Sequence, residues 1–295
     1  MTNPPLFRVG LLLTERCDVA CRHCWFSSSP DGNASMTLEQ AKRYVDEAAV
    51  NGARWVSFTG GEPFLVYGLL RGLTAYASSR ELFNEAVTNC NWATSRKTAL
   101  DLLSPLRDAG LDTLNLSVDD FHQECILLER VRNCYEAAKW LELKPVLMIA
   151  VKKDSVITSD RIGEIMEDSS IQVLGGERVP NPSAIVMETH FAPVGRGEKI
   201  PKHELRHIHV ESEPCRQLLT DIGVRPNGDV MPCCGPLGVQ DDAVIGNLEE
   251  ESLREVLERA WLNPRLREIY ETGFRQLDGL YVSRCHMCVE AYQKD

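Results

Sequence analysis

Three cysteines near the start of the chain have the spacing of a compact metal centre. Cys17, Cys21 and Cys24 lie within eight residues in the order Cys-x3-Cys-x2-Cys. Thiolates are soft ligands, and a loop this short can hold three corners of a cubic iron–sulfur cluster while the fourth iron stays open to a substrate or cofactor. A structural zinc that also uses His23 is the alternative, but zinc ligands usually come as two short pairs far apart in sequence. The spacing therefore favours a cluster with one open iron.

A glycine-rich turn is the second candidate element. Gly60-Gly61-Glu62-Pro63 follows residues 54–59, which we predict to be a strand. With this turn after the cysteines, the chain resembles the radical SAM superfamily, whose members carry a Gly-Gly-Glu-Pro motif in this place. The resemblance implies that S-adenosylmethionine binds the open iron through its amine and carboxylate and is cleaved reductively to a 5′-deoxyadenosyl radical. It also implies that the glycines let the backbone approach the methionyl group, with Glu62 near its ammonium and Pro63 in the same cofactor-binding set.

The same resemblance assigns further residues to the cofactor. Ser117 and Asp119 end a predicted strand, and related proteins contact the ribose from this position. A carboxylate beside a strand end is otherwise often a plain cap of the next helix. Trp25, directly after Cys24, is counted with the cofactor-binding residues.

A second group of cysteines lies toward the end of the chain: Cys215, Cys233, Cys234, Cys285 and Cys288. A closed cluster or a zinc site needs four ligands, so one cysteine is left over. Neighbouring side chains on extended backbone point to opposite faces, so Cys233 and Cys234 should not bind one centre together. We predict Cys215, Cys233, Cys285 and Cys288 as ligands of a second [4Fe-4S] cluster, with zinc as the alternative. This part resembles the shortened auxiliary-cluster domain, called twitch or half-SPASM, of many radical SAM enzymes.

The leftover thiol of Cys234 has a specific chemical use. An S–H bond is weak enough to give a hydrogen atom to a carbon radical. The arrangement resembles that of the epipeptide-type radical SAM peptide epimerases, through residues 24–30, the Gly-Gly-Glu element and Pro232-Cys233-Cys234. The resemblance implies that a ribosomally made peptide loses a Cα hydrogen and regains one from Cys234 on the other face. An L-residue would thereby become a D-residue.

Other functions fit the same residues. A peptide maturase that forms thioether or C–C cross-links, or that dehydrogenates, would use the same two clusters but remove two electrons. A radical SAM dehydrogenase of a small molecule is a further alternative, and so is a non-catalytic metal-binding sensor, which would need no methionyl pocket at residues 60–62. Only six residues precede the first predicted strand, so we expect a separate partner or the barrel rim to recognise a leader peptide.

The segments around these residues alternate between predicted strands and helices. The strands are predicted at residues 7–13, 54–59, 84–88, 112–118, 145–151 and 184–188. The helices are predicted at residues 36–50, 69–79, 95–109, 127–143 and 161–168. This alternation predicts parallel βαβ units, whose ligands sit at the C-terminal ends of the strands, where the cysteines and the glycine turn fall. Similar proteins form a six-stranded partial barrel, so we predict an α/β fold with a partial (β/α)6 TIM barrel.

The pattern changes after residue 213. Asn227-Gly228 between two β-prone runs predicts a hairpin, and helices are predicted at residues 253–261 and 265–271. We therefore predict a radical SAM partial barrel at residues 1–190 and a connecting segment at 191–213. A small hairpin-plus-helix auxiliary iron–sulfur domain is predicted at 214–295.

Composition limits the partners. The chain has 295 residues and a formal net charge of −11, which argues against a nucleic-acid partner, because such proteins normally present a basic face. Residues 9–13 are too short an apolar run to span a membrane, and no secretory pattern is present, so we expect a cytoplasmic protein without a membrane partner. The expected partners are a peptide substrate, with a small molecule as the alternative, and a reductant such as flavodoxin or ferredoxin.

Overall fold

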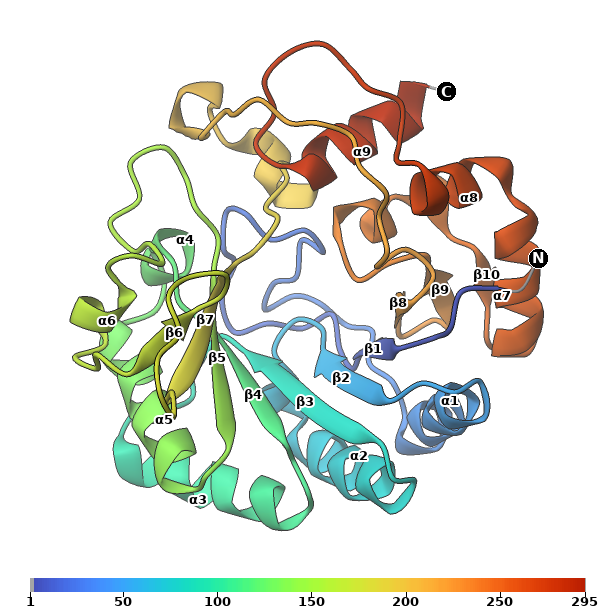
Figure 1. Cartoon of the computed structure of the whole chain (residues 1–295). Helices are drawn as coiled ribbons and strands as arrows, with labels where there is room; N and C mark the ends of the chain where they lie inside the picture. Colours follow the sequence, from blue (N-terminus) through green and yellow to red (C-terminus); the bar gives the residue numbers. More distant parts are fainter. Residues whose placement is uncertain (1–2, 295) are drawn as a thin grey trace.

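The core of the molecule is one open β-sheet. The computed structural model describes residues 3–294, and within this range ten strands form a single sheet in the order β10-β9-β8-β1-β2-β3-β4-β5-β7-β6. Neighbouring strands are parallel from β8 to β6, whereas β8–β9 and β9–β10 are antiparallel. The strands are β1 (Arg8–Leu12), β2 (Trp55–Thr59), β3 (Phe83–Thr88), β4 (Thr113–Ser117), β5 (Lys144–Ile149), β6 (Ile171–Val173), β7 (Ala184–Glu188), β8 (Asp221–Val224), β9 (Asp229–Met231) and β10 (Gly246–Asn247). Figure 1 shows them arranged as a fan whose two edges do not meet.

Helices cover the outer face of this fan (Figure 1). The long ones are α1 (Leu38–Val50), α2 (Tyr67–Ser79), α3 (Arg96–Asp108) and α5 (Leu128–Trp140), and the short ones are α4 (Asp120–Gln123) and α6 (Ile162–Ile165). Their starts follow local chemistry: Thr37 and Gln40 form a reciprocal capping box at α1, and Ser95 caps α3. Buried apolar residues of α1, α2, α3, α5 and α6 join the outer face of the sheet in one continuous hydrophobic core. That core fixes the positions of the strand ends.

The inner face of the fan carries the residues available for chemistry. On β1, Val9 and Leu11 are buried in the outer core, whereas Arg8, Gly10 and Leu12 line a cavity on the inner face. This alternation follows from the two-residue period of a strand. The parallel strands with an open edge confirm the predicted α/β fold with a partial barrel.

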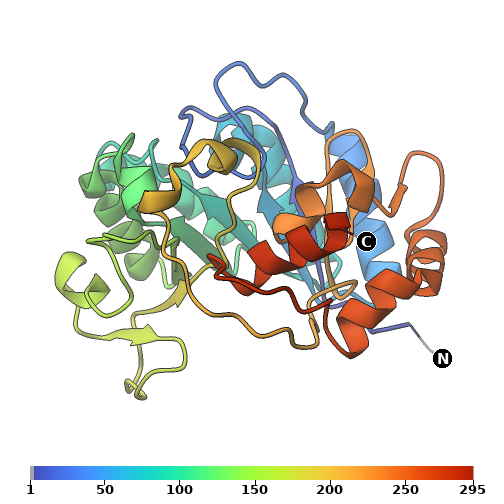
Figure 2. The same cartoon turned by 90° about the horizontal axis from the view of Figure 1, so that it is seen from above.

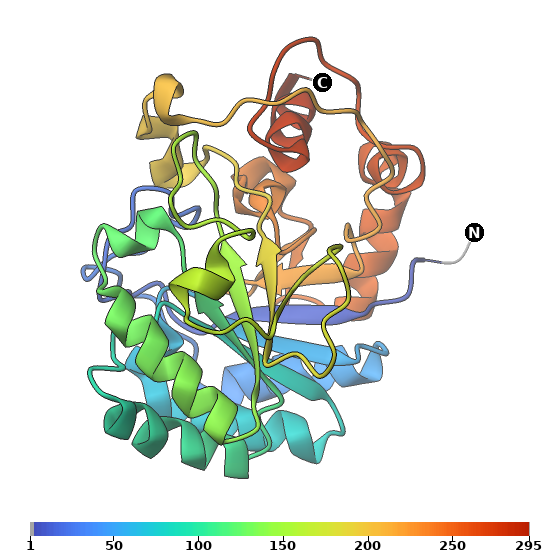
Figure 3. The same cartoon turned by 60° about the vertical axis from the view of Figure 1, so that its left-hand side comes forward.

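The C-terminal part adds a hairpin and three helices to one side of the sheet (Figure 2). Strands β8 and β9 are joined by the predicted Asn227-Gly228 turn, where Gly228 has a φ of +90°, a conformation that suits glycine. The helices are α7 (Leu253–Leu262), α8 (Pro264–Glu271) and α9 (Arg284–Lys294). They enclose a second hydrophobic core, separate from the core of the sheet. Figure 3 shows the connecting segment, in gold, running from β7 to this part of the chain.

The structure differs from the predicted elements in several places. Neither the four-residue helix α4 nor the two-residue strand β10 was predicted. The predicted helix at 161–168 is reduced to α6, because the chain turns at Glu167 with a φ of +57°, which ends a right-handed helix. The edge strand β6 was not predicted, since its three residues give no readable alternation. Helix α9 was also missed, because Cys285 and Cys288 were considered only as ligands and not as part of a helical pattern.

Among the described residues, no helix is both long enough and apolar enough to cross a membrane. The predicted domain boundaries at residues 190 and 213 stay a prediction.

Candidate cofactor and cluster sites

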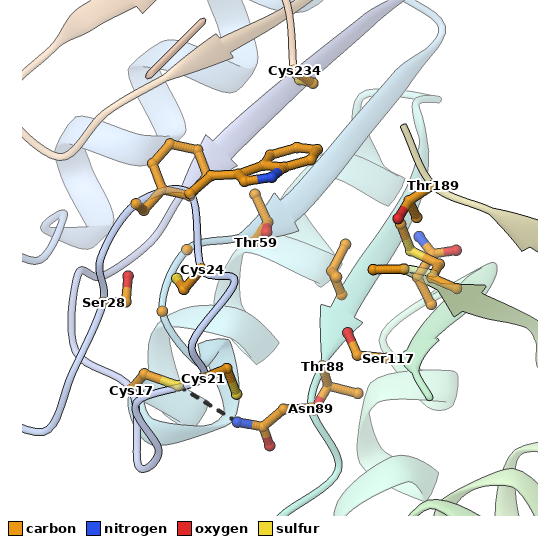
Figure 4. A pocket seen from close by; sticks show the side chains of 18 of the residues that line it. Cys17, Cys21, Cys24, Ser28, Thr59, Thr88, Asn89, Ser117, Thr189 and Cys234 are labelled. Atoms are coloured by element: carbon orange, nitrogen blue, oxygen red, sulfur yellow. Dashed lines mark hydrogen bonds between the residues drawn. The ribbon is translucent and has the colours of Figure 1, made fainter. Parts of the chain in front are cut away.

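A cavity of about 350 Å³ lies on the inner face of the sheet. It brings together many residues that were assigned from the sequence: Cys17, Cys21, Cys24, Trp25, Gly60, Gly61, Ser117, Asp119 and Cys234. Figure 4 shows Cys17, Cys21 and Cys24 at one end of this cavity and Cys234 at the other. The thiols are thus divided between two opposite walls with room for small molecules between them.

The cysteine loop, defined here as residues 16–29, gathers its thiols at the cavity wall. Cys17 donates its backbone N–H to the carbonyl of Ser29 at 3.0 Å, and Cys24 donates to the carbonyl of Cys21 at 3.2 Å. Burial raises the pKa of Cys17 to about 12 and also raises the pKa of Cys21, and the neighbouring thiols add to both shifts. Clustered thiols that ionise poorly alone suit a metal centre, because a bound cation displaces their protons.

Asn89, at the end of β3, holds one of these cysteines. Its side-chain Nδ2 donates to Sγ of Cys17 at 3.5 Å and to Oδ1 of Asp18 at 2.9 Å. Figure 4 shows the first of these contacts as a dashed line. Hydrogen bonds to ligand sulfurs are one of the means by which proteins tune cluster potentials. Asn89 was not among the site residues inferred from the sequence.

The glycine turn packs directly on the backbone that leads into the cysteine loop. Gly61 donates its N–H to the carbonyl of Thr14 at 2.6 Å, and Glu62 donates to the carbonyl of Arg16 at 2.8 Å. A Cβ on Gly60 would lie 2.4 Å from the Thr14 oxygen, and one on Gly61 would lie 2.0 Å from the Arg16 oxygen. The glycines therefore allow two backbone segments to meet. Both glycines also line the cavity, so this packing is compatible with their predicted approach to a methionyl group.

We expect Gly61→Ala to destabilise the chain. The added Cβ meets backbone atoms of Arg16, which cannot move without shifting Cys17, so the free energy of unfolding should fall by about 1–3 kcal/mol or more. Urea denaturation of the metal-free protein measures this, and the iron content after anaerobic reconstitution should fall with it.

Gly68→Ala is the matched control for this substitution. Gly68 lies in α2, and a Cβ added to it would have no heavy atom within 4 Å, so alanine should be neutral or stabilise by up to about 1 kcal/mol. Equal stability of the two variants would contradict the proposed close contact.

Glu62 is fully buried behind the cavity wall and, like Pro63, is not among the lining residues. Its carboxylate accepts hydrogen bonds from the Thr88 hydroxyl at 3.0 Å and from the N–H groups of Asn89 at 2.9 Å and Phe64 at 3.1 Å. Burial raises the pKa of Glu62 to about 8, against the opposing effect of these donors. This geometry gives Glu62 a role in joining the glycine turn to the end of β3. Its predicted place near an ammonium stays a prediction.

Asp119 caps a helix and also lines the cavity, so its predicted contact with a ribose stays a prediction. It lines the cavity, and its Oδ1 caps α4 by accepting from the N–H of His122 at 2.9 Å. Its Oδ2 accepts from the N–H of Ala150 at 3.2 Å and contacts Nδ1 of His122 at 2.9 Å. Burial alone would raise the pKa of Asp119, but the two nearby imidazoles, His122 and His23, and the hydrogen bonds from His122 hold it below its usual range. Ser117, the last residue of β4, also lines the cavity (Figure 4).

Cys234 faces the cavity from the opposite side. Its thiol donates to the carbonyl of Ile222 at 3.0 Å, and a Cβ on Gly10 would lie only 2.8 Å from its sulfur. The glycine in the middle of β1 therefore makes the space that the thiol occupies. Burial, with the Asp221 carboxylate adding to it, raises the pKa of Cys234 well above its usual value, whereas Arg8 opposes the shift.

The remaining C-terminal cysteines form a separate cluster outside the cavity. Burial, with the thiol of Cys215 adding to it, raises the pKa of Cys233 and of Cys285 to about 12. The pKa of Cys288 is raised by burial and by these same three thiols. Cys285 and Cys288 are three residues apart on α9 and so share one face of the helix. The structure thus brings together the cysteines predicted as auxiliary ligands, whereas Cys234 lies in the wall of the cavity.

Several cavity residues were missed from the sequence: Arg8, Thr59, Glu85, Asn89, Met148, Met187, Thr189 and Arg196. Most lie on the inner face or at the C-terminal ends of strands that were predicted. Their position in the strand period was therefore a usable signal. Arg196 lies in the irregular connecting segment and left no such signal.

Models of two protein families match the chain. The Radical SAM superfamily matches residues 11–143, and the iron-sulfur cluster-binding domain SPASM matches residues 215–289. The first range contains the cysteine loop and the glycine turn. The second contains Cys215, Cys233, Cys234, Cys285 and Cys288.

Two bacterial proteins of peptide biosynthesis are among the similar sequences. YydG of Bacillus subtilis (strain 168), which is named as a proposed peptide biosynthesis protein, is 27% identical over 274 residues, covering 90% of this chain and 81% of YydG. AlbA of the same strain, named for biosynthesis of the antilisterial bacteriocin subtilosin, is 31% identical over 113 residues. That match covers 37% of this chain but only 25% of AlbA.

Two solved structures share the fold. SuiB of Streptococcus suis bound to S-adenosylmethionine aligns over 93% of this chain and 69% of SuiB, with a TM-score of 0.60 and 16% identity. The structure of anSMEcpe with bound AdoMet aligns over 99% of this chain and 95% of that protein, with a TM-score of 0.59 and 13% identity. At such identities the likeness extends to the fold alone.

Proposed function

We propose that this chain, a radical SAM enzyme with a C-terminal SPASM domain, inverts an L-residue of a ribosomally made peptide to the D-form. The similarity to YydG over nine tenths of the chain supports a peptide substrate. The observation that carries the proposal is the separation of the adjacent cysteines: Cys234 points into the cavity, while Cys233 joins the auxiliary cysteines. A thiol on the wall opposite the cysteine loop suits hydrogen return to the far face of a substrate carbon.

The residues present fit the cofactors that these two domains use, S-adenosylmethionine and [4Fe-4S] clusters. Cys17, Cys21 and Cys24 would hold a four-iron cluster with three soft donors at the cavity, so one iron would be without a protein ligand. The auxiliary cysteines supply four donors, which suits a closed cluster. When bound, S-adenosylmethionine and the first cluster supply a 5′-deoxyadenosyl radical able to remove a hydrogen atom from carbon.

The chain's own residues then have distinct tasks. The glycine turn and Ser117, Asp119 and Trp25 shape and line the cofactor end of the cavity. Cys234 gives the hydrogen atom of its S–H group to the planar substrate carbon, and a new C–H bond forms on the opposite face. The sulfur then regains one proton and one electron, with a reductant such as flavodoxin or ferredoxin as the electron source. The substrate is inverted with no net oxidation.

The test is a reaction in D2O with a short peptide as the probe, chosen by inspecting the reading frames next to this gene. The Cys234 thiol exchanges its hydrogen with solvent, so inversion should place one deuterium on one Cα and add one mass unit. Acid hydrolysis and chiral analysis should then find the deuterium in a D-residue. A product lighter by two hydrogens would instead establish a cross-linking or dehydrogenating maturase.

The remaining expectations belong to the same proposal. We propose the partial barrel at residues 1–190, the connecting segment at 191–213 and the auxiliary domain at 214–295. A cytoplasmic location suits clusters that need a reducing environment.

A further inference from the structure

The connecting segment attaches itself to the cysteine loop through one arginine. Arg196 lies in a short 3-10 turn, Gly195–Lys199, and its guanidinium donates to the carbonyl of Cys21 at 3.0 Å and to that of Ser28 at 2.7 Å. Its backbone N–H donates to the carbonyl of Cys24 at 3.1 Å. A single residue therefore binds the loop at three carbonyls, two of which belong to predicted cluster ligands.

Gly195, the residue before Arg196, also packs closely against the cysteine loop. Gly195 has a φ of +57°, and a Cβ there would lie 2.1 Å from the carbonyl oxygen of Trp25. Only a residue without a side chain allows the turn to approach the loop so closely. The packing leaves Arg196 half-buried, with its side chain on the cavity wall.

The charge of Arg196 is not neutralised locally. Its side-chain hydrogen bonds go to backbone carbonyls, and within residues 3–294 no carboxylate forms an ion pair with it. The loop itself holds two more arginines. Arg22 is paired with Glu124 at 2.7 Å and Glu204 at 2.9 Å, and the side chain of Arg16 is exposed to solvent, which screens its charge. Arg196 thus brings an uncompensated positive charge to the loop, in a place where burial reduces screening by water.

We propose that Arg196 is a positioning residue that orders the cysteine loop and raises the reduction potential of the cluster held there. Reduction adds a negative charge to a site that thiolate ligands already make negative. A fixed nearby cation favours the reduced state, and net charge is a known determinant of cluster potentials. This inference does not depend on which substrate the enzyme modifies.

Two substitutions separate order from charge. Arg196→Met removes the charge and the two side-chain contacts to carbonyls, whereas Arg196→Lys keeps the charge but lacks the planar fork that reaches both. In an EPR-monitored redox titration without substrate, Arg196→Met should have a more negative midpoint. At the potential where half of the wild-type cluster is reduced, the ratio of reduced to oxidised cluster in Arg196→Met should be about tenfold lower. For a one-electron couple this ratio corresponds to a midpoint lower by about 59 mV. Arg196→Lys should restore most of that shift.

Hydrogen exchange of the metal-free protein tests the ordering role. Both variants should exchange the amides of residues 16–29 faster than the wild type. Arg206→Gln is the matched control, because Arg206 lies in the same segment but pairs with Glu188 at 3.1 Å, away from the loop. It should change neither measurement.

Either measurement can overturn the proposal. An unchanged midpoint in Arg196→Met with full iron content refutes the role of charge, and unchanged exchange in both variants refutes the role in order. If Arg196→Met takes up no iron, two other measurements test the proposal: hydrogen exchange of the metal-free Arg196→Met protein and the midpoint potential of Arg196→Lys. Exchange as slow as in the wild type refutes the proposal, and so does an Arg196→Lys midpoint far below that of the wild type. Neither readout involves the peptide, so failure here leaves the epimerisation proposal standing, and the reverse holds as well.

Discussion

Cys234→Ala is expected to abolish formation of the D-residue while 5′-deoxyadenosine is still produced. The substitution removes the hydrogen donor but leaves the cysteine loop, at the other end of the cavity, unchanged (Figure 4). Formation of the D-residue should fall by at least about a hundredfold, the lower end of what the loss of a positioned proton-transfer group costs other enzymes. Chiral amino-acid analysis measures this loss, and chromatography of 5′-deoxyadenosine in the same samples measures cofactor cleavage.

Cys234→Ser is the matched variant. Serine fills nearly the same space beside Gly10 and can donate to the carbonyl of Ile222, as the thiol does. Its O–H bond is too strong to give a hydrogen atom to a carbon radical, so it should be as inactive as alanine with a less disturbed site. Both variants should retain full iron content. Normal amounts of D-residue from either variant would eliminate Cys234 as the donor.

Cys21→Ala is expected to stop cofactor cleavage altogether. With only two thiols left in the cysteine loop, the first cluster should not assemble, and iron should fall by about four atoms per chain. 5′-Deoxyadenosine should then be undetectable under strong reductant. Anaerobic iron and sulfide quantitation measures the first effect, and a single-turnover assay measures the second.

Cys288→Ala separates the two cysteine sites. It removes a thiol from the auxiliary cluster on α9 and should also cost about four irons, yet it leaves the cysteine loop intact. This variant should still cleave S-adenosylmethionine. The assignment of the two sites would be wrong if Cys21→Ala kept cleavage and Cys288→Ala lost it. Zinc in place of iron in either site of anaerobically purified wild type would contradict the clusters directly.

The two groups of cysteines could be predicted as cluster sites from the sequence because their spacing is local information. The predicted ligands of the first site lie within eight residues, and the chain only has to form one loop to bring them together. The distinction between Cys233 and Cys234 followed from the alternation of extended backbone, and the structure places their side chains in separate surroundings. The parallel strands and their helices were also readable, because hydrophobic periodicity repeats within each segment.

Only the tertiary structure decided what surrounds those residues. Asn89 contacts Cys17 across 72 positions of the chain, and Arg196 contacts Cys21 across 175. The glycine turn, interpreted from the sequence as a cofactor contact, also proved to be the place where the backbone at residues 14–16 packs. Spacing along a chain can show which residues could bind a metal together. Spacing does not show which distant backbone groups and charges contact those residues. These contacts form only when the sheet brings remote segments side by side, which depends on the packing of the whole chain.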